Sequence, residues 1–280
     1  MLESTEDRIL DSALTAYQLH AKVTDNAQYC DRWQEPEPAV DACIFHLIGE
    51  GECMLKAPCL PSAEKLVAGD LVVFPHGSAH HLSGDGYTTM LCGEFNFITG
   101  PKNPILDSLP DCVIVRVSEA GTAFQRVAQI MCEEARSRSF GSRAVLDKLA
   151  DSLFVMTVRH HLSRTSQRRG LLAALADPKL SRALAVMHLK PGQDWTVADL
   201  ANEACMSRTA FSELFSAVMG MSPINYLTHW RMMEAIKLLQ DSGLSVLAIA
   251  ERFGYQTEAA FRRSFKRVHG HGPGHFRRAK

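Results

Sequence analysis

An internal repeat in the last third of the chain constrains the fold more than any other feature of the 280-residue sequence. Val197–Ala201 matches Val246–Ala250 at an offset of 49 residues, and Phe211–Phe215 matches Phe261–Phe265 at an offset of 50. Apolar residues at these spacings share one face of an α-helix. The repeat therefore predicts two copies of one small helical unit.

Capping residues divide each copy into two short helices. Thr196, with an acidic residue three positions later, begins the first helix as in a capping box, and Ser207 begins a second helix over Arg208–Met219. The second copy repeats this order as Ser245–Arg252 and Thr257–Val268. Two helices joined by a short turn are the pattern of a helix-turn-helix, whose second helix enters the major groove of DNA. We therefore expect the C-terminal part to bind double-stranded DNA.

The charge distribution favours a polyanionic partner for this part of the chain. Residues 1–170 hold 16 Lys and Arg against 22 Asp and Glu, whereas residues 171–280 hold 14 against 9.

A chain of this length is typical of about two domains. Its apolar runs are shorter than the roughly 20 residues that span a bilayer, and its acidic N-terminus lacks the order of a signal peptide. We therefore expect a cytoplasmic protein with no membrane partner.

Residues 20 to about 117 follow a β pattern instead. Short apolar runs such as Cys43–Ile48 and Leu71–Phe74 alternate with turn sequences rich in Gly and Pro, which is typical of a β-sandwich or barrel. The segment Gly69–His80 fits the pattern G-x5-P-x-G-x2-H and resembles the second sequence motif of the cupin β-barrels. Its Pro-x-Gly bend is expected to direct His80 toward the barrel interior.

Helical periodicity returns in Thr122–Arg138 and Arg143–Leu162. The apolar stripe of the second helix has two interpretations, packing on the barrel or forming a dimer face, and we favour a homodimer. The polar, basic stretch 163–170 is typical of a linker. A further helix is expected near the N-terminus, over Glu6–Tyr17.

Residues 178–280 resemble the DNA-binding domain of the AraC/XylS family of bacterial transcription regulators. The second unit carries the resemblance, with Ala248–Tyr255, Phe261 and Phe265 followed by Gly270 and Pro273. The resemblance implies an α+β chain with a cupin-like sensor barrel over 1–120, a helical hairpin over 121–162, a linker over 163–177 and an AraC-type domain with two helix-turn-helix units over 178–280. It also implies a sequence-specific transcription activator that meets RNA polymerase, and not an enzyme.

Positions near the start of each second helix are expected to face DNA. The candidate base-reading residues are Ser207, Arg208, Thr209 and Ser212 in the first unit, and Gln256, Thr257, Glu258 and Arg262 in the second. The candidate phosphate contacts are Arg263, Lys266, Arg267, Arg277 and Arg278.

The sequence leaves three candidate signals that the barrel could sense: an oxidant, a small organic effector and a metal ion. Seven of the eight cysteines lie before residue 133, and the run from Phe45 through Cys92 resembles the subgroup that includes a reactive-chlorine-responsive activator. That resemblance implies a thiol switch between Cys30 and Cys92, in which one thiol is oxidised and the other resolves it to a disulfide. Cys30 lies in a stretch, Asp25–Gln34, without a strand pattern, where a thiolate would be accessible.

The alternatives are a small organic effector bound in the barrel and a metal such as zinc, held by His46, His76 and His80. The sequence lacks the first metal motif of the cupins, H-x-H-x3–4-E. For this reason we expect neither a catalytic cupin nor a required cofactor.

Overall fold

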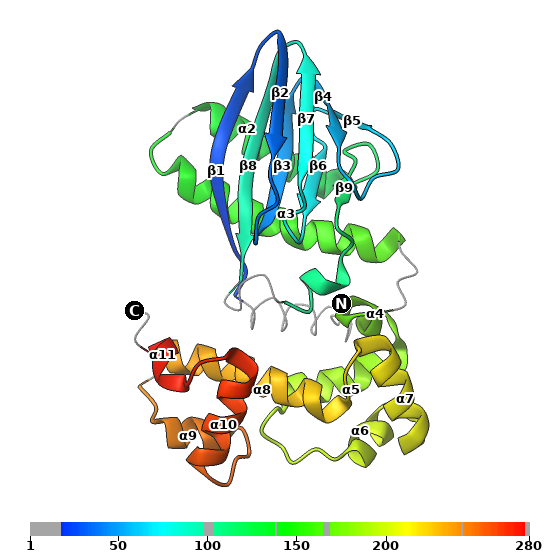
Figure 1. The fold of residues 1–280 in the computed structure, drawn as a ribbon, viewed down its shortest axis with the longest axis vertical. Helices are drawn as coiled ribbons and strands as arrows, with labels where there is room; N and C mark the ends of the chain where they lie inside the picture. The colour runs from blue at the N-terminus through cyan, green and yellow to red at the C-terminus, as the bar shows by residue number, and fades with distance from the viewer. Residues whose placement is uncertain (1–17, 98–102, 138, 165–168, 242, 278–280) are drawn as a thin grey trace. The chain divides into compact units, whose positions relative to one another are not determined.

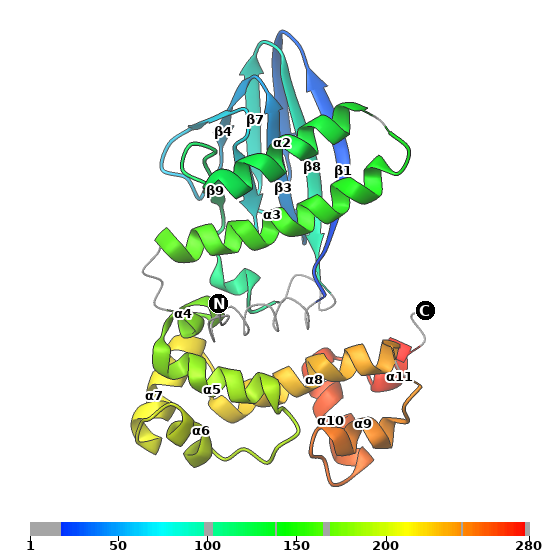
Figure 2. The same ribbon diagram turned by 180° about the vertical axis from the view of Figure 1, so that it is seen from behind.

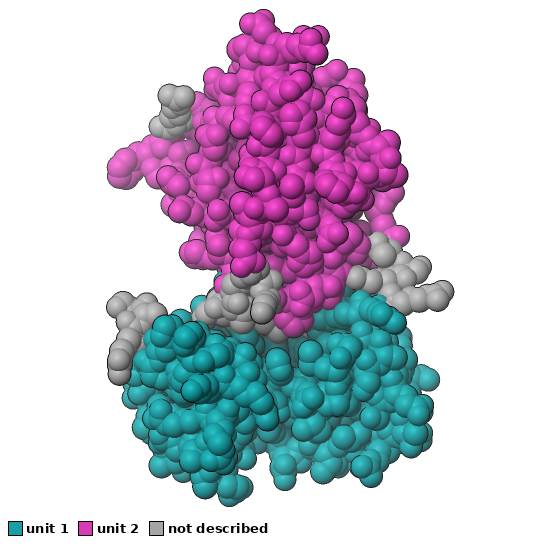
Figure 3. Space-filling model, in the orientation of Figure 1, with its two compact units in different colours: residues 1–18, 167–280 teal, residues 19–166 magenta. Residues whose placement is uncertain are grey.

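The computed structural model describes residues 18–97, 103–137, 139–164, 169–241 and 243–277. The chain divides into two compact units, which we name in chain order: the first covers residues 19–166 (magenta in Figure 3), and the second contains residues 167–280 (teal in Figure 3). The helix expected over Glu6–Tyr17 and the phosphate candidate Arg278 lie outside the described residues. In the described part of the chain, no helix combines the length and the apolar content needed to cross a membrane.

Two antiparallel β-sheets form the first unit (Figure 1). The five-stranded sheet has the order β1-β8-β3-β6-β9, and the four-stranded sheet has the order β2-β7-β4-β5. The strands are β1 (His20–Tyr29), β2 (Arg32–Glu37), β3 (Cys43–Glu50), β4 (Glu52–Lys56), β5 (Glu64–Val67), β6 (Leu71–Phe74), β7 (His80–Asp85), β8 (Thr88–Asn96) and β9 (Val113–Val115). The apolar runs that the sequence marks as strands are therefore confirmed.

Asp25–Gln34 is the exception, because it is mostly strand although it lacks an apolar pattern. It contains the end of β1 and the start of β2, joined at Cys30 and Asp31. β1 is an edge strand whose buried side chains are Ala21 and Val23. Pairing with β8 satisfies the backbone N–H and C=O groups of the β1 residues that follow Val23. These residues therefore form a strand without alternating apolar and polar side chains.

The core of this unit lies between the two sheets. Trp33, Leu55, Leu66 and Leu82 of the four-stranded sheet pack in one buried cluster with residues of the five-stranded sheet, which are Ile48, Val72, Phe74 and Met90. The Gly69–His80 motif places β6 in this core and turns the chain so that His80 is buried, its ring stacked on Phe74 with 3.9 Å between centroids. The expected inward direction of His80 is confirmed.

Helices α2 (Thr122–Ser137) and α3 (Ser142–Arg164) lie across the five-stranded sheet (Figure 2). Most of the apolar stripe of α3 is used inside the unit, because Leu146, Leu153, Phe154 and Val158 are buried. The carboxylates of α3 also cap the free edge of β1, which is the edge opposite β8. Asp151 accepts from the backbone N–H of Ala21 at 2.6 Å, and Asp147 accepts from that of Val23 at 2.8 Å. Packing on the barrel, the interpretation that we did not favour, therefore accounts for part of this face, whereas Val145 is exposed and Leu149 and Met156 are half-buried.

The described residues of the second unit form helices joined by turns and loops, with no strand among them. Its helices are α4 (Leu171–Ala176), α5 (Pro178–Leu189), α6 (Val197–Glu203), α7 (Arg208–Met219), α8 (Pro223–Asp241), α9 (Val246–Arg252), α10 (Glu258–His269) and α11 (Pro273–Arg277). The predicted linker 163–177 is too long, since α3 runs to Arg164 and α4 occupies Leu171–Ala176. The three leucines of α4 are buried, which makes this segment part of the core rather than a connection.

Candidate functional site

Side-chain caps fix the start of the helices in both repeats. Thr196 accepts from the Asp199 N–H at 3.2 Å while the Asp199 carboxylate accepts from the Thr196 N–H at 3.0 Å, so the predicted capping box is present. Ser207, Ser245 and Thr257 each accept from the backbone N–H three residues later, at 3.3, 3.1 and 3.2 Å. Each cap satisfies a helix-end donor that would otherwise be unpaired.

The two units also share one core geometry. Phe211 and Phe215 of α7 are fully buried with ring centroids 5.6 Å apart and planes tilted by 54°. Phe261 and Phe265 of α10 are buried in the same way, at 5.6 Å and 48°. The repeat found in the sequence is therefore a repeat in three dimensions, and α7 and α10 occupy the position of recognition helices.

The candidate base readers lie just before α7 and α10 or in their first two turns, whereas the phosphate candidates Lys266, Arg267 and Arg277 lie in the last turn of α10 and in α11. Two of the predicted base readers, Ser207 and Thr257, use their hydroxyl oxygens as helix caps. Glu258 accepts from Arg262 Nε at 2.6 Å, so the acid holds the guanidinium in place on the surface of α10. The remaining candidates on exposed surface are Arg208, Thr209, Gln256, Arg263, Lys266, Arg267 and Arg277, and Ser212 is half-buried.

A contact between the repeats, not foreseen from the sequence, sets their relative orientation. α8 is about 28 Å long at 1.5 Å per residue and contacts helices of both repeats. Its Arg231 donates from Nε to the Pro191 carbonyl at 2.6 Å and from Nη2 to the Gln193 carbonyl at 2.7 Å. Between these carbonyls, Gly192 lies so close to the second repeat that a Cβ there would be 2.1 Å from the Arg252 carbonyl oxygen.

We call these contacts the Arg231 clamp, which consists of Arg231, the loop Pro191–Gln193 and the turn Arg252–Gly254. The clamp joins the loop before α6 to the turn between α9 and α10. The Pro191-Gly192 pair marks the loop in the sequence as the end of a helix, but only the tertiary structure brings the two segments together.

Three buried or half-buried side chains form a hydrogen-bonded chain inside the first unit. His46 on β3 lies directly opposite Cys92 on β8 in the strand register, and its Nδ1 is 3.1 Å from the Cys92 Sγ. The other ring nitrogen of His46, Nε2, is 2.9 Å from Nε2 of His80. The chain ends at the Ser78 carbonyl, 2.9 Å from His80 Nδ1.

The direction of these hydrogen bonds follows from the last acceptor. A carbonyl oxygen only accepts, so His80 Nδ1 donates and, in the neutral ring, His80 Nε2 accepts. His46 Nε2 must then donate, which leaves His46 Nδ1 to accept the thiol proton of Cys92. Burial supports the neutral forms, since it lowers the pKa of His46 to about 3 and raises the pKa of Cys92 to about 12.

The predicted metal trio is not assembled. His46 and His80 are adjacent, but His76 is exposed on the surface, where its charge acts on Asp107. The third side chain beside the two buried histidines is that of Cys92, which contacts His46 and which only the strand register could have revealed. Among the residues that the structure describes, no group of three His, Cys, Asp or Glu side chains is arranged to hold a metal ion.

Cys30 and Cys92 are not brought together either. Cys92 pairs with Asp25 across β1 and β8, and Cys30 lies five residues further along, just beyond β1. At about 3.4 Å per residue in a strand, their Cα atoms are about 17 Å apart, against about 7 Å at most for a disulfide. Cys30 is exposed and Cys92 is half-buried, and both are free thiols.

Residues 8–163 match the family described as Cupin, and residues 200–279 match the family described as Helix-turn-helix domain. The HTH-type transcriptional regulator AlkR of Acinetobacter baylyi is 31% identical over 85% of this chain and 89% of its own. A putative AraC-like transcription regulator of Streptomyces lividans is 28% identical over 96% of this chain and 97% of its own. The chain belongs to the AraC-type transcription regulators.

Other members are similar over most of their length. The RCS-specific HTH-type transcriptional activator RclR of Escherichia coli is 29% identical over 88% of both chains. Among solved structures, the DNA-binding domain of AdpA in complex with a target DNA is 32% identical, with a TM-score of 0.34 over 37% of this chain and 92% of that one. As a member of the family, this chain is a DNA-binding transcription regulator with a cupin domain, and it is not an enzyme.

Proposed function

We propose that this AraC-type regulator is an activator that responds to oxidants in the cytoplasm, and that its switch is the Cys92 thiol with Cys30 as its disulfide partner. The observation that carries the proposal is the hydrogen-bonded chain Cys92–His46–His80–Ser78. The Cys92 thiol donates a hydrogen bond to His46 Nδ1, so this thiol stays protonated and is held in place until an oxidised Cys30 reaches it. The name of the relative RclR, an RCS-specific activator, supports the same class of signal.

The exposures of the two thiols suggest the order of the steps. Cys30 is exposed and meets the oxidant first, whereas burial and the acidic neighbours Asp25, Glu35 and Glu37 keep the Cys92 thiol protonated. Linking the two sulfurs requires residues 25–29 of β1 to leave their partners on β8, because the paired register holds Cys30 about 17 Å from Cys92. Oxidation would therefore rearrange the edge of the five-stranded sheet, which is the change a regulator needs in order to transmit a signal.

β1, the strand at this edge of the five-stranded sheet, also contacts α3. The backbone bonds from Ala21 and Val23 to the α3 carboxylates connect β1 to the hairpin. Three apolar side chains of α3, Val145, Leu149 and Met156, are exposed or half-exposed at spacings of four and seven residues, which follow one face of a helix. We propose that this remaining face of α3 forms the homodimer and that the regulator on DNA meets RNA polymerase.

Contacts with promoter DNA follow from the exposed faces of α7 and α10. Arg208 and Arg262 are proposed to read bases, with Thr209, Ser212, Gln256 and Glu258 beside them. Arg263 and Lys266 are proposed to contact phosphates. The caps Ser207 and Thr257 hold the helix starts in position, and their hydroxyl protons remain able to donate to a base or a phosphate.

Peptide mapping tests the switch. The reduced full-length protein receives one equivalent of hypochlorous acid, is digested without reductant and is analysed by mass spectrometry. We expect a Cys30–Cys92 link that dithiothreitol reverses, that is absent from the Cys30→Ser variant and that is retained in Cys205→Ser, a matched removal of an exposed thiol in the other unit. Survival of both thiols, or random linkage among the eight cysteines, would refute the switch. Titration with zinc and ligand screening would then test the metal and organic effectors.

A further inference from the structure

A polar cleft in the second unit lies between α8 and the last turn of α10. It has a volume of about 280 Å³, and its lining consists of Asn225, Thr228 and His229 of α8 with Arg267 and Val268 of α10. The two helices contact each other within one compact unit. The cleft is separate from the base-reading residues and from the Arg231 clamp.

Helix periodicity brings these side chains together. Asn225, Thr228 and His229 have the spacing i, i+3 and i+4, so they share one face of α8. On α10, Val268 lies three residues after the buried Phe265 and continues the apolar face of that helix. Arg267 lies about 100° around the helix from Val268 and therefore borders that face. The cleft thus combines one apolar side chain with four polar ones.

The polar side chains of the cleft favour an anion. The Arg267 guanidinium is a cation with N–H donors in a planar fork, and the Asn225 amide and the His229 ring also carry N–H donors. The Thr228 hydroxyl donates to the Ile224 carbonyl at 2.8 Å, so its proton is already engaged within α8. Of the described residues that line the cleft, none is acidic.

Arg267 also lacks a counter-charge. Arg262, five residues earlier on the same helix, is paired with Glu258 at 2.6 Å. Arg267 has no ion-pair partner among the residues that the structure describes. Burial and, as a smaller cause, the positive charge of Arg267 lower the pKa of His229. A bound anion would compensate both groups, which belong to different helices.

The charge of the second repeat supports the same class of ligand. Residues 245–270 hold five Lys and Arg against two Asp and Glu, whereas residues 196–220 of the first repeat hold one against three. A surface with an excess of one charge raises the local concentration of ions of the opposite charge. The cleft uses α10 and therefore belongs to the more basic repeat.

We propose that this cleft is a binding site for a phosphate group, which pairs with Arg267 and is also bonded by Asn225 and His229 from the opposite helix. A guanidinium can bind a phosphate through two parallel N–H bonds. A phosphate held there would bridge the helix that connects the two repeats and the second recognition helix. Its binding would therefore act on the orientation of α10 and on the affinity for DNA.

Two sources could supply the phosphate, a small phosphorylated ligand and the DNA backbone. Arg267 lies about 14 Å along α10 from Glu258, where the base-reading positions of this helix begin, at 1.5 Å per residue. The cleft is thus at the far end of the helix from those positions, which favours the small ligand. The experiment includes an arm for each source.

Inorganic phosphate and the reduced full-length protein test the first source, independently of the thiol switch. Calorimetric titrations are made at an ionic strength held constant with sodium chloride. We expect saturable binding of one phosphate per chain. The midpoint of thermal unfolding should rise by about 3 °C or more when phosphate is at about ten times its dissociation constant.

Variants of exposed side chains locate the binding. Arg267→Gln and His229→Gln should each weaken phosphate binding by about fivefold or more, because each removes a donor to a charged group. Arg267→Lys keeps the charge without the planar fork and should retain part of the affinity. Arg263→Gln is the matched control, since it removes an exposed cation of α10 that does not line the cleft, and it should leave phosphate binding nearly unchanged.

A DNA titration tests the second source. Fluorescence anisotropy measures binding to a site selected from a random library over a range of salt concentrations. If free phosphate does not bind but Arg267→Gln lowers the slope of log K against log salt by about 0.9, the phosphate site is kept and its ligand is the DNA backbone. The proposal would be overturned if neither effect is found, or if Arg263→Gln weakens phosphate binding as much as Arg267→Gln does.

Discussion

Replacing Arg231 by methionine should separate the two helix-turn-helix units in function without unfolding either one. Arg231→Met keeps the aliphatic part of the side chain on α8 and removes the guanidinium that bonds the Pro191 and Gln193 carbonyls at 2.6 and 2.7 Å. Each unit retains its own caps and its own buried phenylalanine pair. The change therefore acts on the orientation between the units.

The size of the effect follows from the two bonds. A hydrogen bond from a charged donor contributes about 1.5–3 kcal/mol, and the bond to Gln193 is exposed to solvent, so the pair together contributes about 2 kcal/mol. If binding to both halves of a site must restore the lost orientation, the dissociation constant for the full site rises roughly 25-fold, at about 1.4 kcal/mol per factor of ten. Binding to one half-site does not require the orientation and should change less than about twofold.

The assay uses a DNA site selected in vitro by binding to the protein. A site is selected from a random library with the wild-type chain, and fluorescence anisotropy then measures affinity for this site and for versions with either half scrambled. Lys237→Met, which removes another cation from α8, is the matched control for charge. Gly192→Ala is a second route to the same defect, because its Cβ would meet the Arg252 carbonyl. Equal losses on full and half-sites, or full affinity in both clamp variants, would refute the reasoning.

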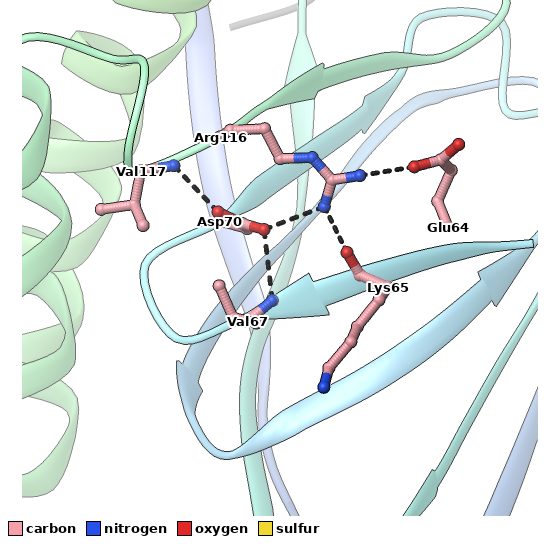
Figure 4. A network of polar contacts seen from close by, with 6 residues as sticks. All are labelled: Glu64, Lys65, Val67, Asp70, Arg116 and Val117. Atoms are coloured by element: carbon pink, nitrogen blue, oxygen red, sulfur yellow. Dashed lines mark hydrogen bonds and ion pairs between the residues drawn. The ribbon is translucent and has the colours of Figure 1, made fainter.

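Three other predictions follow from named contacts. Asp70→Ala should lower the free energy of unfolding by about 3–5 kcal/mol in urea titrations, because it leaves Arg116 and two backbone N–H groups without their buried acceptor; a loss below about 1 kcal/mol would contradict the network in Figure 4. Burial lowers the pKa of His46 to about 3, so the unfolded chain binds the extra proton between about pH 6.5 and 3. His46 should therefore favour folding above about pH 6.5 and lose up to about 1.4 kcal/mol per pH unit below it, and His46→Asn should flatten that slope in acid titrations of stability. Lys266→Gln should reduce the slope of log K against log salt by about 0.9 without altering base preference, whereas an unchanged slope would remove Lys266 from the phosphate contacts.

Local sequence patterns predict most of the helices and many of the strands of this protein. The caps Thr196, Ser207, Ser245 and Thr257 and the apolar spacing of the repeats fix helices through contacts within four residues, so their bounds follow from the sequence. The strands at Cys43–Glu50 and Leu71–Phe74 were equally visible, because both lie in the apolar core. β1 was not, since an edge strand with polar residues has no signal until β8 pairs with it.

The residues of the candidate sites depended on contacts between distant segments. The sequence contains His46, Cys92 and Arg231, and their side-chain types limit the chemistry that each can perform. Strand register placed Cys92 opposite His46, and the packing of the helices brought Arg231 to the carbonyls of Pro191 and Gln193. A shift of one residue in the register of β8 would turn Cys92 to the other face of its sheet, away from His46. The sequence by itself therefore determined the helices, most strands and the family, whereas only the tertiary structure decided which thiols and bases meet, because that depends on how the whole chain packs.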